Sequence, residues 1–131
     1  MTTRDPLTVL HAHMTAFNDR DVAGLLDGFT EDAEWMTGKY TCRGHAELGE
    51  LFEGAFAAIA PRLEVRRVIP GDGVVAAELV EHMIVDGHRM SAAIAGFYLV
   101  RDGRIARAKI YREGSADLPA TEAAGSGAGA D

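Results

Sequence analysis

The chain has 131 residues, a length that fits one domain built on one hydrophobic core. Its 13 basic and 20 acidic residues give a net charge of -7, so nucleic acid and anionic membrane surfaces are disfavoured as partners. Cys42 is the only cysteine, which excludes an internal disulfide, and without an apolar signal region or a membrane-spanning run we expect a cytoplasmic protein.

Two helices are predicted at the start of the chain. Asp5 is a good N-cap, and Pro6 fits the first helical position, where no free N–H is needed. Apolar residues that recur at spacings of three and four predict one buried helix face, formed by Leu7, Leu10, Met14 and Phe17. Asp21 is placed to cap a second, short helix, which we expect to end near Thr30.

A strand, a third helix and a second strand follow. Residues 32–40 alternate between apolar and polar side chains, which is typical of a strand. Apolar residues recur with helical spacing over 45–60, and Pro61 should end this helix. Residues 63–69 form the second expected strand.

The longest pattern covers residues 74–113. Apolar and β-branched residues repeat there in three blocks, and the pairs Asp86-Gly87 and Asp102-Gly103 predict two tight hairpin turns between three strands. Gly96, inside the middle block, predicts a bend or a bulge. We therefore expect a meander of three long antiparallel strands.

Helical segments ahead of such a meander resemble the nuclear transport factor 2-like superfamily, in particular its SnoaL-like branch. The local sequences that carry the resemblance are FTEDAEW, RDGRI and IYRE, within residues 6–113. The resemblance implies an α+β fold in which three N-terminal helices pack on a strongly curved antiparallel sheet, a cone-shaped, cystatin-like barrel with a pocket inside. We expect a domain over 1–113 and a disordered tail over 114–131, which has few large apolar residues.

A homodimer packed sheet to sheet is also implied by the resemblance. Alternate strand positions on the outer face of the sheet offer apolar surface for it, at Val80, Ile105 and Tyr111. His82, Arg107 and Lys109 share that face. Such a dimer would be isologous, with the same surface used by both copies.

Strand alternation predicts which residues face the pocket. If Trp35 and Thr37 point inward, as in the family, the inward residues of the meander are mostly small or apolar. Such a pocket suits an apolar small molecule. The residues predicted to bind it are Trp35, Thr37, Leu79, Met83, Ile94, Tyr98, Ile110 and Arg112.

Glu81 falls in the same inward set and is the first catalytic candidate. A carboxylate among apolar neighbours is costly, and burial would raise its pKa toward the range that suits a general acid or base. Two other interpretations stay open: an ion pair with Arg112, or a register that leaves Glu81 in solvent.

His13 is the second catalytic candidate. In the ketosteroid isomerase branch of the superfamily, the aligned position carries the tyrosine that holds the substrate oxyanion, and a histidine could donate a similar hydrogen bond. The alternative is a half-exposed histidine satisfied by water. The other histidines show no metal-ligand spacing, so we expect no metal. Chemistry carried by Glu81 and His13 would also need no cofactor.

Two enzyme branches of the superfamily leave tests in the sequence. The isomerase carboxylates align with Thr37 and with Ala95 or a close neighbour, and the arginine and two aspartates of the epoxide hydrolase align with Leu79, Glu81 and Ile110. Only one of these positions is acidic here. The sequence therefore favours a cofactor-free cyclase or isomerase that moves a proton on a hydrophobic carbonyl compound, and the alternative is a non-catalytic ligand-binding or dimerising accessory module.

Overall fold

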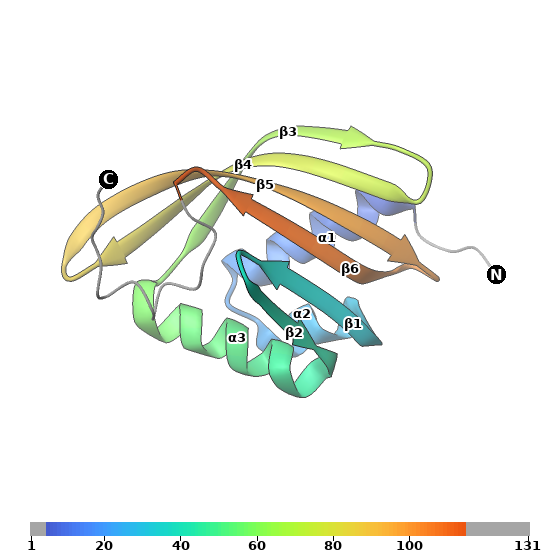
Figure 1. The fold of residues 1–131 in the computed structure, drawn as a ribbon, viewed down its shortest axis with the longest axis horizontal. Coiled ribbons are helices and arrows are strands. Elements are labelled where there is room, and N and C mark those ends of the chain that lie inside the picture. The colour runs from blue at the N-terminus through green and yellow to red at the C-terminus, as the bar shows by residue number, and fades with distance from the viewer. Residues whose placement is uncertain (1–4, 115–131) are drawn as a thin grey trace.

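The computed structural model describes residues 5–114, so the expected tail lies almost wholly outside the described residues. Three helices and six strands are found in this part of the chain (Figure 1). In chain order they are α1 (Pro6–Asn18), α2 (Val22–Asp27), β1 (Phe29–Thr37), β2 (Tyr40–Arg43), α3 (Gly44–Ile59), β3 (Arg62–Pro70), β4 (Val74–Val85), β5 (His88–Arg101) and β6 (Arg104–Arg112). Within residues 5–114, no helix combines the length and the apolar character that crossing a membrane requires.

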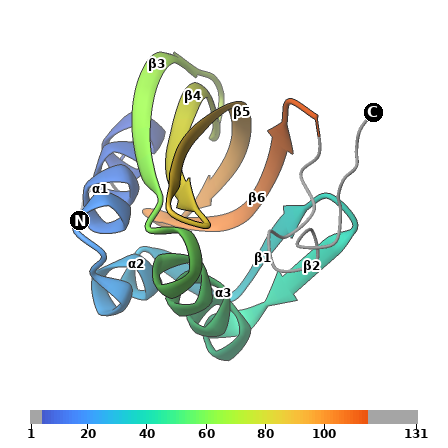
Figure 2. The ribbon, with the colours of Figure 1, turned by 90° about the vertical axis from the view of Figure 1, so that its left-hand side faces the viewer.

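The strands form one curved mixed sheet in the order β2-β1-β6-β5-β4-β3. Figure 1 shows the long strands arching over α1 and α3, and Figure 2 shows β1 and β2 at the opposite end of the sheet from β3. The expectation of a purely antiparallel sheet is wrong, because β1 pairs with β6 in parallel. Alternation within a strand does not say which strand will be its neighbour, so the sequence pattern carried no signal for this pairing.

Both predicted helix caps are confirmed. The Thr8 N–H donates to Asp5 Oδ1 at 2.8 Å, and the Gly24 N–H donates to Asp21 Oδ1 at 3.0 Å. Each carboxylate satisfies an amide group that has no partner within its helix. The short helix α2 ends at Asp27 rather than near Thr30, because β1 already begins at Phe29.

The buried face of α1 differs from the predicted stripe at one end. Leu7 is exposed, whereas Val9, which was not in the stripe, is almost fully buried. The buried residues of this helix are Val9, Leu10, His13, Met14 and Phe17. Spacings of four from Val9 through His13 to Phe17 therefore define the face that packs on the sheet.

The two hairpin turns of the meander are confirmed. Asp86 and Gly87 have φ angles of 52° and 80°, and Asp102 and Gly103 have φ angles of 55° and 76°. Two consecutive residues in the left-handed region are the signature of the type I′ turn, whose twist matches that of the flanking strands. The turns set the register of β4 with β5, and that of β5 with β6 next to the second turn.

Gly96 does not mark a bulge. The register shift between β5 and β6 lies at Leu99 and Val100, while Gly96 pairs regularly with Ala77 and Ile110. This shift also corrects the expected position of Ile105, which was assigned to the outer face but is completely buried. One extra residue in a strand reverses the side on which the following residues point.

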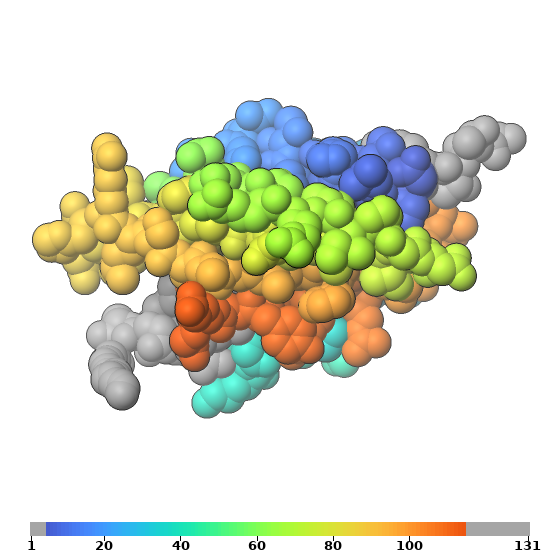
Figure 3. Space-filling view, turned by 90° about the horizontal axis from the view of Figure 1, so that it is seen from above, coloured from blue at the N-terminus to red at the C-terminus, as the bar shows by residue number. Residues whose placement is uncertain are grey.

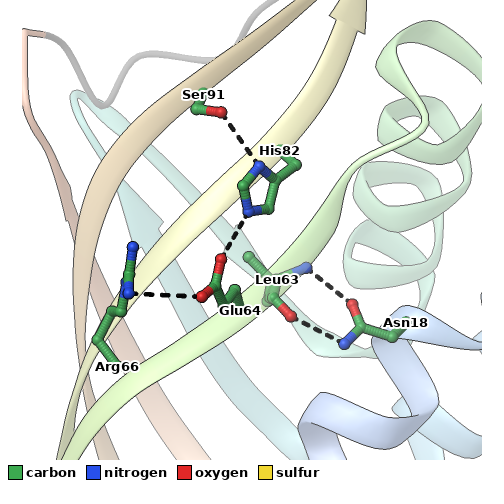
Figure 4. A network of polar contacts seen from close by, with 6 residues as sticks. All are labelled: Asn18, Leu63, Glu64, Arg66, His82 and Ser91. Atoms are coloured by element: carbon green, nitrogen blue, oxygen red, sulfur yellow. Dashed lines mark hydrogen bonds and ion pairs between the residues drawn. The ribbon is translucent and has the colours of Figure 1, made fainter.

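Asn18 fastens the end of α1 to the edge strand β3 (Figure 4). Its Nδ2 donates to the Leu63 carbonyl at 2.9 Å, and the Leu63 N–H donates to its Oδ1 at 2.8 Å. Both backbone groups of Leu63 are thereby satisfied at an edge that would otherwise be open. The helix and the strand are held in a fixed relation at this point.

The outer face of the sheet is exposed, and the view from above in Figure 3 shows the long strands running across it. A shallow groove on this face is lined by Met36, Val74, Phe97, Leu99, Arg107, Lys109 and Tyr111. Phe97 and Tyr111 meet edge to face there, with ring centroids 5.9 Å apart. Nearer β3, a polar network links Ser91, His82, Glu64 and Arg66 (Figure 4).

Candidate functional site

A cavity of about 80 Å³ lies between the helices and the inner face of the sheet. The helices contribute only apolar side chains to it, those of Phe17, Leu51, Phe52, Ala55 and Ile59. The sheet contributes Trp35, Thr37, Leu63, Glu81, Ile94, Tyr98, Ile110 and Arg112. The cavity is therefore largely apolar, with its charged groups gathered on the sheet side.

Glu81 and Arg112 meet in the wall of this cavity. Glu81 belongs to β4 and Arg112 to β6, and the intervening strand β5 places the small residue Ala92 opposite Glu81. Arg112 Nη2 donates a hydrogen bond to Glu81 Oε1, and the two side chains are only 20% and 9% exposed. One of the two alternatives for Glu81, the ion pair with Arg112, is thus found, and the other, a solvated carboxylate, is wrong.

Two opposing effects act on the Glu81 carboxyl. Burial, the larger effect, raises its pKa above the usual range, because the charged form loses its hydration. The Arg112 guanidinium acts in the opposite direction through its charge and its hydrogen bond. Since the pKa stays raised in spite of the arginine, Glu81 can exchange a proton closer to neutral pH than an exposed glutamate can.

His13 is buried behind the cavity rather than in its wall. Its side chain is surrounded by the rings of Phe17, Phe29, Trp35, Phe52 and Tyr98, with centroid distances of 5.6 to 6.5 Å. The residue is 4% exposed, so the half-exposed, hydrated alternative is wrong. Neither Nδ1 nor Nε2 has a hydrogen-bond partner among the described residues. Burial lowers the pKa of His13 to about 4, so the ring is neutral at pH 7.

Phe17, Trp35, Phe52 and Tyr98 each touch both His13 and the cavity. These rings separate the imidazole from the open space. Burial also raises the pKa of the Tyr98 hydroxyl, which therefore stays protonated at physiological pH. The site thus offers one carboxyl, one guanidinium and neutral donors in an apolar surrounding.

The chain is similar to known proteins in sequence and in fold. The family model described as the SnoaL-like domain matches residues 10–108. The chain belongs to the SnoaL-like family. A comparison with curated proteins finds no match.

Solved structures similar to this SnoaL-like chain include TerC co-crystallised with polyporic acid, at 22% identity and a TM-score of 0.75, covering 82% of this chain and 90% of that one. A hypothetical protein from Catenulispora acidiphila with a ketosteroid isomerase-like fold, in complex with trimethylamine, has 16% identity and a TM-score of 0.77, covering 91% and 98%. The epoxide hydrolase/cyclase-like enzyme SalBIII, of pyran ring formation in salinomycin, has 20% identity and a TM-score of 0.77, covering 82% and 90%. At these identities the likeness shows the nuclear transport factor 2-like fold.

The SnoaL-like cavity contains most of the residues predicted to face it. Glu81 and six of the predicted binding residues lie in its wall, namely Trp35, Thr37, Ile94, Tyr98, Ile110 and Arg112. Leu79 and Met83 are buried on the same face of the sheet but do not line the cavity. The catalytic and binding roles of all these residues stay predictions.

Sequence reasoning missed the helical half of the wall. Phe17 was predicted only as part of a buried helix face, and the apolar residues of α3 only as a helical pattern, although that spacing places them opposite the inward face of the sheet. Leu63 of β3 was also missed. Among residues 5–114, no group of three or more metal-ligating side chains is close enough to hold a metal ion.

Proposed function

We propose that this SnoaL-like protein binds a small hydrophobic molecule that contains a carbonyl group, and that it acts without a cofactor as a cyclase or isomerase. Glu81 would move the proton as general acid and base. The observation that carries the proposal is the position of Glu81: a buried carboxyl with a raised pKa in the wall of an apolar cavity.

Each part of the cavity has a role in this proposal. The aromatic and aliphatic walls orient the hydrocarbon part of the substrate, while Thr37, Tyr98 and Arg112 add polar side chains to the wall that contains Glu81. Exclusion of water strengthens the electrostatic interactions inside such a site. His13 is proposed as a neutral hydrogen-bonding group, which a ligand reaches only if one of the rings of Phe17, Trp35, Phe52 and Tyr98 rearranges.

A second function, a non-catalytic ligand-binding or dimerising accessory module, is favoured by one observation. Arg112 pairs with Glu81, and a carboxylate held in an ion pair often has a structural role. Under this alternative the cavity binds its ligand and no bond changes. Proton transfer is therefore the property that separates the two functions.

Deuterium exchange tests proton transfer without knowledge of the product. Small hydrophobic ketones, beginning with cyclopentanone, are incubated with the protein in D2O, and exchange beside the carbonyl is followed by NMR. We expect the wild type to accelerate exchange of at least one ketone, and Glu81→Gln to reduce that acceleration by a factor of about 100 or more, which is typical for loss of a general base.

Glu78→Gln is the matched control for this experiment. Glu78 lies on the same strand but its side chain is 60% exposed, so its loss should leave the exchange rate unchanged. Ketones that bind to the wild type without any exchange above buffer would refute the catalytic part and support the accessory module. Equal exchange by the wild type and Glu81→Gln would remove Glu81 from the mechanism.

A homodimer through the outer face of the sheet is part of the proposed function. The exposed side chains of Phe97, Leu99 and Tyr111 support it, since 43% to 53% of each residue is open to solvent on one face. Large apolar residues gathered on one exposed surface are typical of protein interfaces. A second copy of the chain is the proposed occupant of this surface.

A further inference from the structure

Arg112 has more hydrogen-bonding capacity than its ion pair uses. A guanidinium group carries several N–H donors in a fixed planar arrangement. One nitrogen, Nη2, bonds to Glu81, and among residues 5–114 no other hydrogen bond of the Arg112 side chain is found. Arg112 lines the cavity, so its side chain borders the space that a ligand would fill.

The charges in the cavity wall cancel. Among the described residues that line the cavity, Glu81 and Arg112 are the only two that carry a charge near neutral pH, and the others are apolar or uncharged. An ionised ligand would lose its hydration on entry and would repel one member of the pair. An uncharged ligand with an oxygen atom would leave the pair intact and accept a hydrogen bond from the guanidinium.

We infer that Arg112 is a ligand-binding donor, and that with Glu81 it makes the cavity selective for small, uncharged molecules that carry a carbonyl oxygen. This inference rests on the proposed binding of a small molecule in the cavity, although not on catalysis. Glu81 holds the guanidinium in place, and Arg112 Nε or Nη1 donates to the ligand oxygen. If Glu81 also acts as a base, the ligand C–H bond breaks, the proton moves to Glu81, and the electron pair forms an enolate whose oxygen Arg112 holds.

The volume of the cavity sets the size of the ligand. At about 80 Å³ it is roughly half the size of the ~150 Å³ engineered cavity that holds benzene. A five-membered ring, part of which extends through the open side, is a suitable probe. Cyclopentanone and methylenecyclopentane have nearly the same shape and differ in whether an oxygen or a CH2 group is presented.

The experiment measures binding of these two probes, and of cyclopentanecarboxylate, through the methyl NMR signals of isoleucine. Ile94 and Ile110 line the cavity and report binding there, while Ile69 and Ile84 are exposed elsewhere and serve as references. The variants are Arg112→Met and, so that no buried carboxylate loses its partner, the double variant Glu81→Gln/Arg112→Met. Arg107→Met is the matched control, because Arg107 lies on the same strand and is exposed on the outer face.

The quantity compared is the affinity for the ketone divided by the affinity for the hydrocarbon, since this ratio removes their difference in hydrophobicity. We expect the ratio to fall about tenfold in both Arg112 variants, as for a hydrogen bond from a charged donor, and to stay unchanged in Arg107→Met. Cyclopentanecarboxylate should bind the wild type more weakly than the ketone does.

The outcomes separate this inference from the proposed function. Ligand binding that shifts the NMR signals of Ile94 and Ile110 shows that the cavity is occupied. If Arg112→Met then leaves the ratio of ketone to hydrocarbon affinity unchanged, the role of Arg112 is overturned while ligand binding stands. Tighter binding of cyclopentanecarboxylate than of cyclopentanone would overturn the selectivity for uncharged ligands. Absence of binding by every probe to the wild type would overturn the inference together with the proposed ligand site.

Discussion

Two buried ionisable side chains, Glu81 and His13, differ in whether their surroundings supply a polar partner. Arg112 compensates the charge of Glu81, whereas His13 has aromatic rings on every side and no hydrogen-bond partner among the described residues. A buried polar group without a partner costs about 1 to 3 kcal/mol. His13 therefore weakens the fold at a point directly behind the cavity, which is the reason to expect a function for it.

His13 should make the protein less stable in acid. The unfolded chain binds this proton below about pH 6.5, whereas the folded chain binds it only below about pH 4, so stability is lost as the pH falls between these values. From pH 7 to pH 5 the free energy of unfolding should fall by about 2 kcal/mol through this group. Urea unfolding at several pH values measures the change.

Glu81 acts in the opposite sense, because its raised pKa stabilises the folded state as the pH falls. A comparison of the wild type with His13→Leu separates the contribution of His13 from that of Glu81. We expect His13→Leu to be at least as stable as the wild type at pH 7 and to lose most of the acid sensitivity. His11→Leu is the matched control, because His11 is exposed on the same helix. An unchanged pH dependence in His13→Leu would show that another group causes the acid sensitivity.

Some residues of the site could be predicted from the sequence because strand alternation is strict. Once Trp35 was taken to point inward, the inward positions of Glu81, Tyr98 and Ile110 followed. His13 was harder to place, since it lies at one side of the apolar stripe and a histidine is usually partly exposed there. Its spacing of four from Val9 and from Phe17 was the signal that indicated burial.

At the level of the strands, Gly96 makes room for an aromatic ring. Tyr98 lies two residues further along β5 on the same face, and a Cβ atom at Gly96 would approach the Tyr98 ring within 2.6 Å and its hydroxyl within 2.5 Å. We expect Gly96→Ala to force the ring away and to lower the free energy of unfolding by about 1 to 3 kcal/mol. Thermal unfolding of the purified variant measures this loss.

Gly54→Ala is the same substitution with the opposite expectation. Gly54 lies in α3, and nothing stands within 4 Å of the place where its Cβ would be. Alanine should therefore stabilise the helix by about 0.5 to 1 kcal/mol. If Gly96→Ala is as stable as the wild type, the Tyr98 side chain has space to move, and the cavity wall adapts to the extra methyl group more easily than its packing indicates.

Elements that depend on neighbouring residues could be predicted from the sequence, and features that depend on distant strands could not. Helix caps and Asp-Gly turns depend on a few neighbouring residues, so α1, α2 and the two hairpins could be predicted closely. The short strand β2 and the bulge at Leu99 and Val100 depend on pairing with distant strands. Their local sequences contain no sufficient signal, and both were missed.

For the whole molecule, the type of fold could be predicted while the shape of the cavity could not. The order of helices and strands, with three local sequences, was enough to indicate the superfamily. The volume and the lining depend on how side chains from α1, α3 and most of the strands pack together, which no single segment determines. The substrate is therefore a matter for binding experiments.

The final prediction concerns the association of two whole molecules. Phe97 and Tyr111 meet on the exposed outer face, in a groove that Leu99 also lines, so a second copy of the chain would bury these apolar side chains. Light scattering should give twice the mass of the chain for the wild type and the monomer mass for Phe97→Ser/Tyr111→Ser. Leu7→Ser, which removes an exposed apolar residue from α1, is the matched control and should stay dimeric. A dimer that persists in the double variant would place the interface elsewhere, and a monomeric wild type would leave this apolar face to a different partner.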